Sequence, residues 1–254
     1  MRLFCKLGLI LAIFFQGSAA RSEWILQSTT PQRGKGVAFV EKAIRNGSDS
    51  SSRHLFLVLA DPKQCTLRVI DNPGGKRTLG SAMEENGCLA GVNGSYFRPD
   101  FSPVGLEISH GRLIHPLEHG KLISGLVVAN RGSVALLRIG EFKPAPSIKD
   151  AVQCGPFLID HGKVVPGLNA TKRADRTVVL ADGKGGWGLL MAESVTLAEM
   201  AQILATPGML PEIKVTRALN LDGGTSSAIW VNEPPVYERE FKRVRNFVAV
   251  VPGK

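Results

Sequence analysis

The chain is poor in several features that would have pointed to common enzyme classes. Aromatic residues make up 6% of its 254 residues, and only two of them are tyrosines. Its four cysteines form neither a Cys-x-x-Cys pair nor a Cys/His spacing typical of zinc sites. A phosphate-binding loop with its lysine and a Gly-x-Ser-x-Gly nucleophile elbow are also absent. These absences argue against P-loop nucleotide hydrolysis and against a serine hydrolase built on such an elbow.

No apolar run of membrane-spanning length occurs after residue 20, and the run before it has the form of a secretory signal. Arg2 and Lys6 precede or flank an apolar stretch at 7–15, which is too short for a mature transmembrane helix. Ser18-Ala19-Ala20 then offers small side chains to a signal peptidase. We expect residues 1–20 to be removed and the protein to be exported, either periplasmic or secreted. An uncleaved membrane anchor is the alternative, and no stable membrane insertion of the mature protein is expected.

Positive charge exceeds negative charge. Lys and Arg number 31 against 22 Asp and Glu, a net charge of +9 that falls to about +7 when Arg2 and Lys6 leave with the signal. No nucleic-acid-binding motif accompanies this charge, so no nucleic-acid partner is expected. A basic surface also suits anionic glycans, phosphates or membrane surfaces.

Three cysteines remain after signal removal: Cys65, Cys88 and Cys154. An odd number allows at most one disulfide within the chain, and export permits it. Cys65–Cys88 is the first candidate pair.

Two parts of the mature chain differ in character. Residues 21–53 are expected to form an N-terminal lead-in, extended over 21–35, with a strand or short helix at 36–43 and a turn-rich loop at 46–53. Residues 54–254 are expected to form a single α+β domain with a largely antiparallel or mixed β-sheet core and a few flanking helices.

Two helices are predicted within this domain. Residues 79–86 fit a short helix that ends at Gly87. Residues 196–205 fit a second, in which Thr196 and Glu199 complete a capping box. One or two further helical turns are expected at 147–152.

Strands are expected to outnumber these helices. Residues 54–60 and 65–70 flank an Asp61-Pro62-Lys63 turn and predict a hairpin. Four short apolar segments separated by glycines, at 104–109, 112–116, 125–130 and 133–139, predict an antiparallel meander. Further strands are predicted at 88–92, 156–160, 176–181, 187–192, 217–221, 227–231 and 246–251.

One polar segment, Leu221-Asp222-Gly223-Gly224-Thr225-Ser226-Ser227, is typical of a phosphate-handling site. Gly223 and Gly224 leave their backbone N–H groups open to an anion, and Thr225 and Ser226 add hydroxyl donors. A carboxylate such as Asp222 beside these donors suits hydrolysis of a phosphate ester. An ordinary β-turn, in which these residues serve only geometry, is the alternative.

Arg176 is a second candidate, because it opens an apolar strand and its planar guanidinium matches a phosphate group. A surface ion pair with Asp175 or Asp182 is the alternative. The sequence does not choose a second acid or base among five carboxylates: Glu107, Asp160, Asp175, Asp182 and Glu193.

The histidines show no metal-ligand spacing, and no metal ligands or other cofactor are assigned. A divalent metal at Asp222 remains an alternative without a second fixed ligand.

Six blocks follow one another along the chain: Asn93 to Phe97, Gly105-Leu106 with Gly111, Gln153 to Pro156, Arg176-Thr177, Leu221 to Ser226 and Val244-Arg245-Asn246. Taken in this order, they resemble the phosphodiester glycosidase family, and the resemblance covers about residues 54–251. Three positions depart from the family pattern: Ser95 and Thr225 replace glycines, and Glu107 replaces an apolar residue.

The resemblance implies hydrolysis of sugar-1-phosphodiesters in envelope or extracellular glycans, so the expected partner is a phosphorylated glycan. It implies that Asp222 acts as acid/base or nucleophile, and that Arg176 holds the phosphate. The substrate-binding residues it implies are Asn93, Tyr96, Gln153, Gly155, Gly223, Gly224, Thr225, Ser226 and Asn246. Two other functions stay open: a non-catalytic glycan-binding or exopolysaccharide-assembly protein on the same scaffold, and a metal-dependent phosphoesterase.

Overall fold

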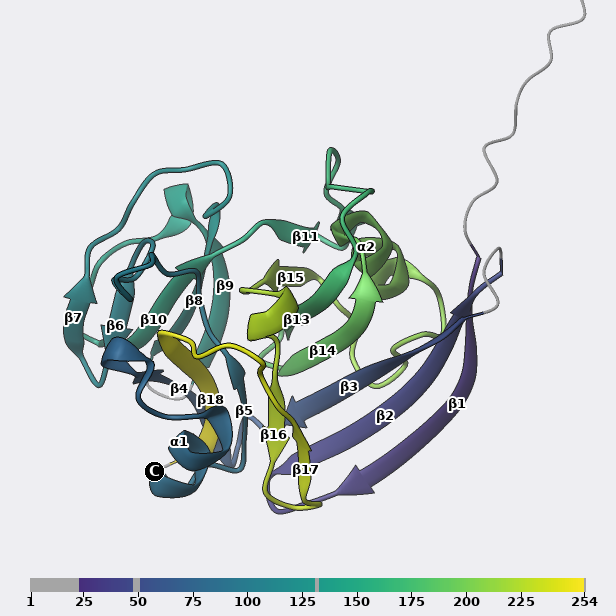
Figure 1. Cartoon of the computed structure of the whole chain (residues 1–254), viewed down its shortest axis with the longest axis horizontal. Coiled ribbons are helices and arrows are strands. Elements are labelled where there is room, and N and C mark those ends of the chain that lie inside the picture. Colours follow the sequence, from purple (N-terminus) through teal and green to yellow (C-terminus); the bar gives the residue numbers. More distant parts are fainter. Residues whose placement is uncertain (1–22, 48–50, 131–132, 254) are drawn as a thin grey trace, which may run out of the picture.

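The computed structural model describes residues 23–47, 51–130 and 133–253, so the expected signal segment 1–20 lies outside the described residues. The described part contains eighteen β-strands and two α-helices, and every strand pairing within it is antiparallel. The strands form one sheet of eight and two sheets of five (Figure 1). The fold is therefore more strongly β than the predicted α+β class, and its sheets are antiparallel rather than mixed.

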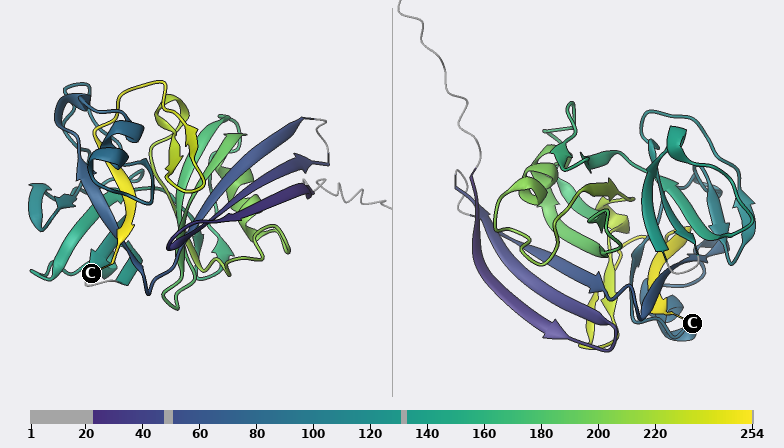
Figure 2. Two further views of the ribbon diagram at one scale, coloured as in Figure 1. Left: turned by 90° about the horizontal axis from the view of Figure 1, so that it is seen from below. Right: turned by 180° about the vertical axis from the view of Figure 1, so that it is seen from behind.

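The eight-stranded sheet begins with the segment expected as a lead-in. Strands β1 and β2 pair along their whole length, and β2 then pairs with β3, so residues 24–46 extend the sheet outward (Figure 1, Figure 2). Of the two alternatives for 36–43, the strand is correct. The order across the sheet is β1 (Trp24–Arg33), β2 (Val37–Asn46), β3 (Ser52–Ala60), β14 (Trp187–Val195), β13 (Ala174–Ala181), β15 (Arg217–Asn220), β11 (Phe157–Asp160) and β12 (Lys163–Val164).

The predicted hairpin at 54–70 is wrong. Both strands exist, but β3 pairs with β2 and β14, whereas β4 (Cys65–Asp71) pairs with β18 (Asn246–Pro252) in another sheet. The turn between them is closed by the Asp61 carbonyl, which accepts from the N–H groups of Gln64 and Cys65. It directs the chain into a different sheet because both edges of β3 are already paired.

The two five-stranded sheets carry the rest of the strands. One has the order β17 (Val236–Glu238), β16 (Ile229–Val231), β5 (Ala90–Asn93), β18, β4. The other has the order β7 (Arg112–His115), β6 (Glu107–Ser109), β10 (Ile148–Cys154), β8 (Gly125–Asn130), β9 (Ser133–Arg138).

Two predictions for the second of these sheets are wrong. The four expected segments form two hairpins, β6–β7 and β8–β9, rather than a continuous meander, because β10 lies between them. The helical turn expected at 147–152 is part of β10. The strand was not recognised because its polar Asp150 does not look like a buried residue in the sequence. In the structure Asp150 is buried and accepts backbone N–H bonds from Val69 and His110.

Both predicted helices are confirmed. Helix α1 (Leu79–Glu85) follows the N-cap Thr78, and α2 (Leu197–Ala205) follows Thr196, whose capping box with Glu199 is complete. Apolar residues of α2 pack on one face of the eight-stranded sheet, while the largest core cluster unites residues of all three sheets. No helix in the described ranges is long and apolar enough to cross a membrane.

The proposed Cys65–Cys88 disulfide is wrong in this structure. Both residues, and Cys154, are buried free thiols. Cys65 packs in the core shared by the three sheets and its thiol donates to the Gly36 carbonyl at 3.0 Å, whereas Cys88 packs in a separate cluster beside α1. The two side chains therefore belong to different core clusters.

Candidate functional site

Residues 221–227, called the Asp222 loop below, begin where β15 leaves the sheet, as the sequence predicts. Two backbone bonds fix it: the N–H of Leu221 donates to the Thr177 carbonyl at 2.8 Å, and the N–H of Asp222 donates to the Gly94 carbonyl at 3.0 Å. A Cβ on Gly223 would lie 2.9 Å from the Asp175 carbonyl oxygen, so glycine lets the loop approach β13 closely.

The Asp222 carboxyl is partly buried at the start of this loop. Its Oδ1 accepts the Gly223 N–H at 2.9 Å. Burial raises its pKa above the usual value, while hydrogen bonds from Ser226 and Gly223 and the nearby Lys242 cation oppose that rise. A carboxyl in this setting retains its proton to a higher pH than an exposed aspartate does, which suits proton transfer. Sequence reasoning missed Lys242, although it lies in the cationic run at 239–245.

Arg176 reaches the same loop from β13. Its Nε donates to the Val195 carbonyl at 3.1 Å and its Nη2 to the Lys172 carbonyl at 2.7 Å. Its Nη1 has no hydrogen-bond partner in the described part of the chain, and it would lie 3.6 Å from a Cβ on Gly223. Burial lowers the pKa of the guanidinium. Two nitrogens therefore hold the side chain in place, and the third faces the Asp222 loop.

The alternative for Arg176, a surface ion pair, does not hold. The residue is buried, and no ion pair joins it to Asp175 or Asp182 in the described residues. Asp175 instead accepts the Ser194 N–H, and Asp182 caps its own turn by accepting N–H groups of Lys184 and Gly186.

Tyr96 lies beside this centre with its hydroxyl already bonded. Its Oη donates to the Gly155 carbonyl at 2.7 Å, and Nδ2 of Asn220 donates to Tyr96 Oη at 3.2 Å. Burial raises the pKa of Tyr96, so the phenol stays neutral. A Cβ on Gly155 would lie 2.5 Å from the Leu122 carbonyl oxygen, which explains glycine there. Sequence reasoning missed Asn220, which no motif distinguished from an ordinary strand residue.

Asn93 supports the loop from behind. It is fully buried, its Nδ2 donates to the Asp222 carbonyl at 2.8 Å, and its Oδ1 accepts from Thr177 Oγ1 at 2.6 Å and from the Ala228 N–H at 3.1 Å. It therefore ties β5, β13 and the Asp222 loop together.

Gln153 does not reach the loop. Its Oε1 accepts the N–H groups of Leu106 and Glu118, and its Nε2 donates to the carbonyls of Glu118 and Ile123. These four bonds use the amide's full capacity. The structure thus contradicts the substrate-binding role implied for Gln153 and makes it a clamp on the segment 105–123.

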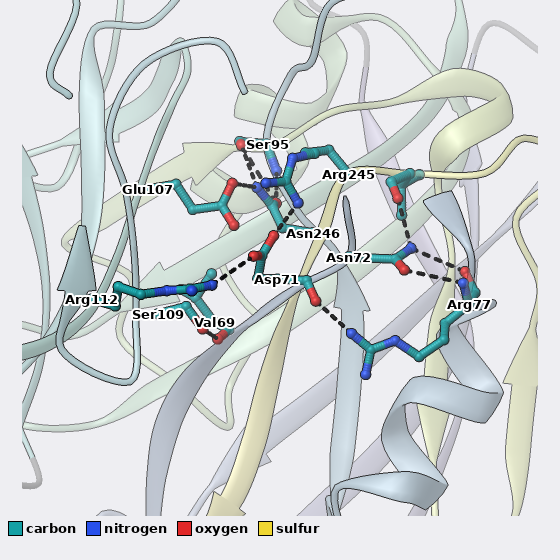
Figure 3. Close-up of polar contacts among 11 residues, drawn as sticks. Val69, Asp71, Asn72, Arg77, Ser95, Glu107, Ser109, Arg112, Arg245 and Asn246 are labelled. Atoms are coloured by element: carbon teal, nitrogen blue, oxygen red, sulfur yellow. Dashed lines mark hydrogen bonds and ion pairs between the residues drawn. The ribbon is translucent and has the colours of Figure 1, made fainter. Parts of the chain in front are cut away.

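Asn246 is also fully buried and lies behind the site. Its Oδ1 accepts the Ser95 N–H at 2.8 Å, while its Nδ2 donates to Glu107 Oε2 at 2.7 Å and to Ser95 Oγ at 3.1 Å (Figure 3). A bond from Asn246 to substrate is therefore contradicted as well. Two departures from the family pattern, Ser95 and Glu107, meet on this one amide.

A pocket of about 350 Å³ borders the Asp222 loop. The exposed Phe241 stands at its rim, and the Phe241 N–H donates to the Thr225 carbonyl at 2.9 Å. Two of the candidate second carboxylates, Asp175 and Glu193, lie in its wall. Sequence reasoning missed Glu238 and Phe241. The lining residues are Asp175, Met191, Glu193, Ser227, Tyr237, Glu238, Arg239 and Phe241.

The other candidate carboxylates lie elsewhere. Asp160 pairs with Arg138 and Arg217, and Glu107 is sealed in the interior. Across residues 23–47, 51–130 and 133–253, no group of three or more His, Cys, Asp or Glu side chains is arranged to hold a metal ion.

One comparison with known proteins identifies a family. The phosphodiester glycosidase family model matches residues 86–251. No curated protein matches the chain in sequence.

Three solved structures share the fold. The match with a hypothetical protein from Synechocystis (15% identity, TM-score 0.61) covers 88% of this chain and 64% of that protein. This chain therefore spans less than two thirds of the length of the Synechocystis protein. The catalytic domain of zebrafish N-acetylglucosamine-1-phosphodiester alpha-N-acetylglucosaminidase, described as auto-inhibited by its pro-peptide (16%, TM-score 0.59), covers 91% of this chain, with 83% of that chain matched. A Burkholderia pseudomallei protein named as exported (14%, TM-score 0.53) covers 82% of this chain, with 77% of that chain matched.

At such identities the structural likeness shows the fold alone. The family model, however, matches well over half of the chain, in the region that contains Asn93, Arg176 and Asp222. The chain belongs to the phosphodiester glycosidase family.

Proposed function

We propose that the protein is an exported hydrolase that cleaves sugar-1-phosphodiester linkages in envelope or extracellular glycans. The observation that carries the proposal is that Asp222, whose pKa is raised, and Nη1 of Arg176, which has no hydrogen-bond partner in the described ranges, meet on one glycine loop. An acid/base group beside a fixed cation suits attack on a phosphate-linked sugar.

The charges around the loop support a phosphodiester as the reacting group. Arg176 and Lys242 supply positive charge near the loop, and the loop itself carries the backbone N–H of Gly224 and the exposed Thr225 hydroxyl as neutral donors. The single negative charge of a phosphodiester matches such a cradle. In the reaction, water adds across the sugar–phosphate linkage, giving the free sugar and a phosphomonoester, while Asp222 transfers the proton.

The adjoining pocket supports a sugar as one part of the substrate. Its carboxylates, Asp175, Glu193 and Glu238, accept hydrogen bonds from hydroxyl groups, and the exposed Phe241 ring offers an apolar face. Asp175 and Glu193 are the candidates for a second catalytic carboxyl group, since both lie in the pocket beside the Asp222 loop.

Turnover of synthetic sugar-1-phosphodiesters tests the proposal. Wild type should release sugar from at least one member of a panel that varies the sugar, and Asp222→Asn should lose this activity. Asp100→Asn is the matched control, because Asp100 is an exposed carboxylate in a separate loop. Each protein is assayed with added Mg²⁺ or Ca²⁺ and with a chelator. Binding of the panel without turnover by wild type under every condition would contradict the hydrolase and favour the glycan-binding alternative.

Export is proposed from the signal-like segment at residues 1–20 and is supported by the Burkholderia relative that is named as an exported protein. Mass spectrometry of the expressed protein should find a mature N-terminus at Arg21. A chain that retains residues 1–20 would contradict cleavage and favour the anchor alternative.

A further inference from the structure

Two carboxyl groups meet in the interior close to the Asp222 site. Glu107 on β6 is fully buried, and Figure 3 shows it beside Asp71 and the guanidinium of Arg245. Arg245 is ion-paired with Asp71, Arg112 approaches Asp71 at 3.5 Å from the exposed side, and Arg77 donates to the Asp71 backbone carbonyl. Among the described residues, Arg245 is therefore the one buried cation beside the two acids, and the exposed Arg112 adds a second positive charge at Asp71.

Two atoms of this cluster, Glu107 Oε1 and Arg245 Nε, lack a hydrogen-bond partner among the residues that the structure describes, although both are buried. Glu107 Oε2 accepts from Asn246, but its buried Oε1 has no hydrogen-bond partner among the residues that the structure describes. A proton on Oε1 would supply the missing bond by donating to the Asp71 carboxylate. Burial, assisted by the Asp71 carboxyl and opposed by Arg245 and Asn246, raises the pKa of Glu107 to about 7.

A continuous set of hydrogen bonds joins Glu107 to the backbone of Asp222. The Asn246 amide, held by Glu107, accepts the Ser95 N–H at 2.8 Å, and the Asn246 backbone carbonyl accepts the Gly94 N–H at 2.9 Å. The Gly94 carbonyl in turn accepts the Asp222 N–H at 3.0 Å. A Cβ on Gly94 would lie 1.9 Å from Asn246 Oδ1, so the turn packs directly against the Asn246 side chain.

We propose that Glu107 is a positioning residue, whose carboxyl shares one buried proton with Asp71 and thereby holds Asn246, the turn at residues 93–95 and the Asp222 loop in their working arrangement. Loss of that proton leaves the fully buried Glu107 carboxylate beside the partly buried Asp71 carboxylate, so that two negative charges lie side by side next to Arg245. This repulsion favours movement of Glu107 toward water and release of Asn246. The inference rests on the proposed function for its catalytic meaning, and it adds that the site loosens above neutral pH.

Other titratable groups near Glu107 have partners of their own. His115, the register partner of Glu107 on β7, lies 3.5 Å from Glu118. Asp150 on β10 accepts the Val69 N–H at 3.0 Å. The proton on Glu107 is therefore governed mainly by Asp71 and Arg245.

The substitution Glu107→Gln removes the titrating proton of Glu107 while keeping the size and shape of the side chain. The glutamine amide is neutral at every pH, can accept from Asn246 through its oxygen and can donate to Asp71 through its nitrogen, so it imitates protonated Glu107. Glu84→Gln is the matched control, since Glu84 is exposed on α1.

Hydrogen exchange of the Ser95 and Asp222 amides measures the positioning directly. Between pH 5 and pH 9 the exchange rate of wild type is divided by that of Glu107→Gln at the same pH, which removes the intrinsic pH dependence of exchange. We expect a ratio near one at pH 5 and about tenfold above pH 8, the change that a loss of one hydrogen bond produces. The Glu84→Gln protein should behave as wild type. A ratio that stays near one throughout would overturn the proposal.

Two further readouts keep the inference and the proposed function distinguishable. In infrared spectra, wild type at pH 5 should show a protonated-carboxyl band that Glu107→Gln lacks, and this band should disappear from wild type with a midpoint near pH 7. If wild type lacks the band at pH 5, the proposal of a shared proton is overturned, even if the variant folds poorly. In turnover assays, kcat/KM of wild type should fall above pH 7 relative to Glu107→Gln. Equal pH profiles would contradict the positioning role. If the exchange rates differ as expected but no protein turns over any substrate, only the proposed hydrolase function is contradicted.

Discussion

The Asp222 loop and the buried cluster of Asn246, Ser95 and Glu107 contain similar polar side chains, but their polar groups differ in whether they remain available to a ligand. At the loop, Arg176 keeps one nitrogen without a hydrogen-bond partner among the residues described, and Thr225 is exposed, so polar groups remain available to a ligand. Around Asn246, amide and carboxyl groups are fully buried and bond to one another or to backbone. Residues of one family pattern therefore divide into those whose polar groups stay available and those whose polar groups hold the loops in place.

The largest effect expected at the loop is on catalysis. Asp222→Asn should lower kcat by about 10²–10⁴-fold, because the amide cannot transfer a proton. The free energy of unfolding should change by less than about 1 kcal/mol, since asparagine retains the oxygen that accepts the Gly223 N–H. Initial rates on the best phosphodiester, together with urea denaturation, measure both quantities. An unchanged kcat would remove Asp222 from proton transfer without contradicting the family assignment.

The opposite result is expected for a residue of the buried set. Gln153→Leu should lower the free energy of unfolding by about 3–5 kcal/mol, because four backbone groups lose their partner inside the protein. Gln32→Leu, at an exposed position on β1, is the control and should change stability little. Urea denaturation gives the comparison. If Gln153→Leu were as stable as the control but failed to bind substrate, the division drawn here between loop and scaffold would be wrong.

The pH dependence of stability provides a third contrast. The pKa of Glu107 is raised from an ordinary 4.5 to about 7 in the folded protein, so between these values the folded state binds a proton that the unfolded state has released. Stability from this group is complete below pH 4.5 and is lost as pH rises to 7, by about 3 kcal/mol at most. Subtracting the unfolding curves of Glu107→Gln from those of wild type isolates this change. A difference that is constant from pH 4 to pH 8 would contradict it.

Local features of the fold were predictable from sequence, and long-range pairings were not. The capping residues Thr196 and Glu199 are sufficient to predict α2, because a capping box is a local interaction. One partner of β3 is β14 and the partner of β4 is β18, and both of these strands lie more than a hundred residues further along the chain. The plausible turn at residues 61–63 therefore suggested a false hairpin. Strand β10 was missed because the N–H groups of Val69 and His110, which let Asp150 be buried, come close to it only in the folded protein.

The same distinction explains the site. The order of the motifs predicted correctly that Asp222, Gly223 and Arg176 lie together. It failed for Gln153 and Asn246, whose amides bond within the protein, because the direction of a side chain depends on the three-dimensional neighbours around it. Lys242 was missed since it approaches Asp222 from a loop without regular structure.

The smallest effect is expected at Thr225, the exposed position of the loop where the family pattern has glycine. The Thr225 backbone carbonyl accepts N–H bonds from Phe241 and Lys242, and a substitution of the side chain leaves these bonds in place. Thr225→Gly should therefore cost only about 0.5–1 kcal/mol of stability, through added freedom of the unfolded chain. Removal of the side chain widens access to the loop, so kcat/KM for a bulky phosphodiester should rise a few-fold relative to a small one. Parallel assays of the two substrates measure this ratio, and a fall in kcat comparable to that of Asp222→Asn would instead make the Thr225 hydroxyl a direct partner of the reacting phosphate.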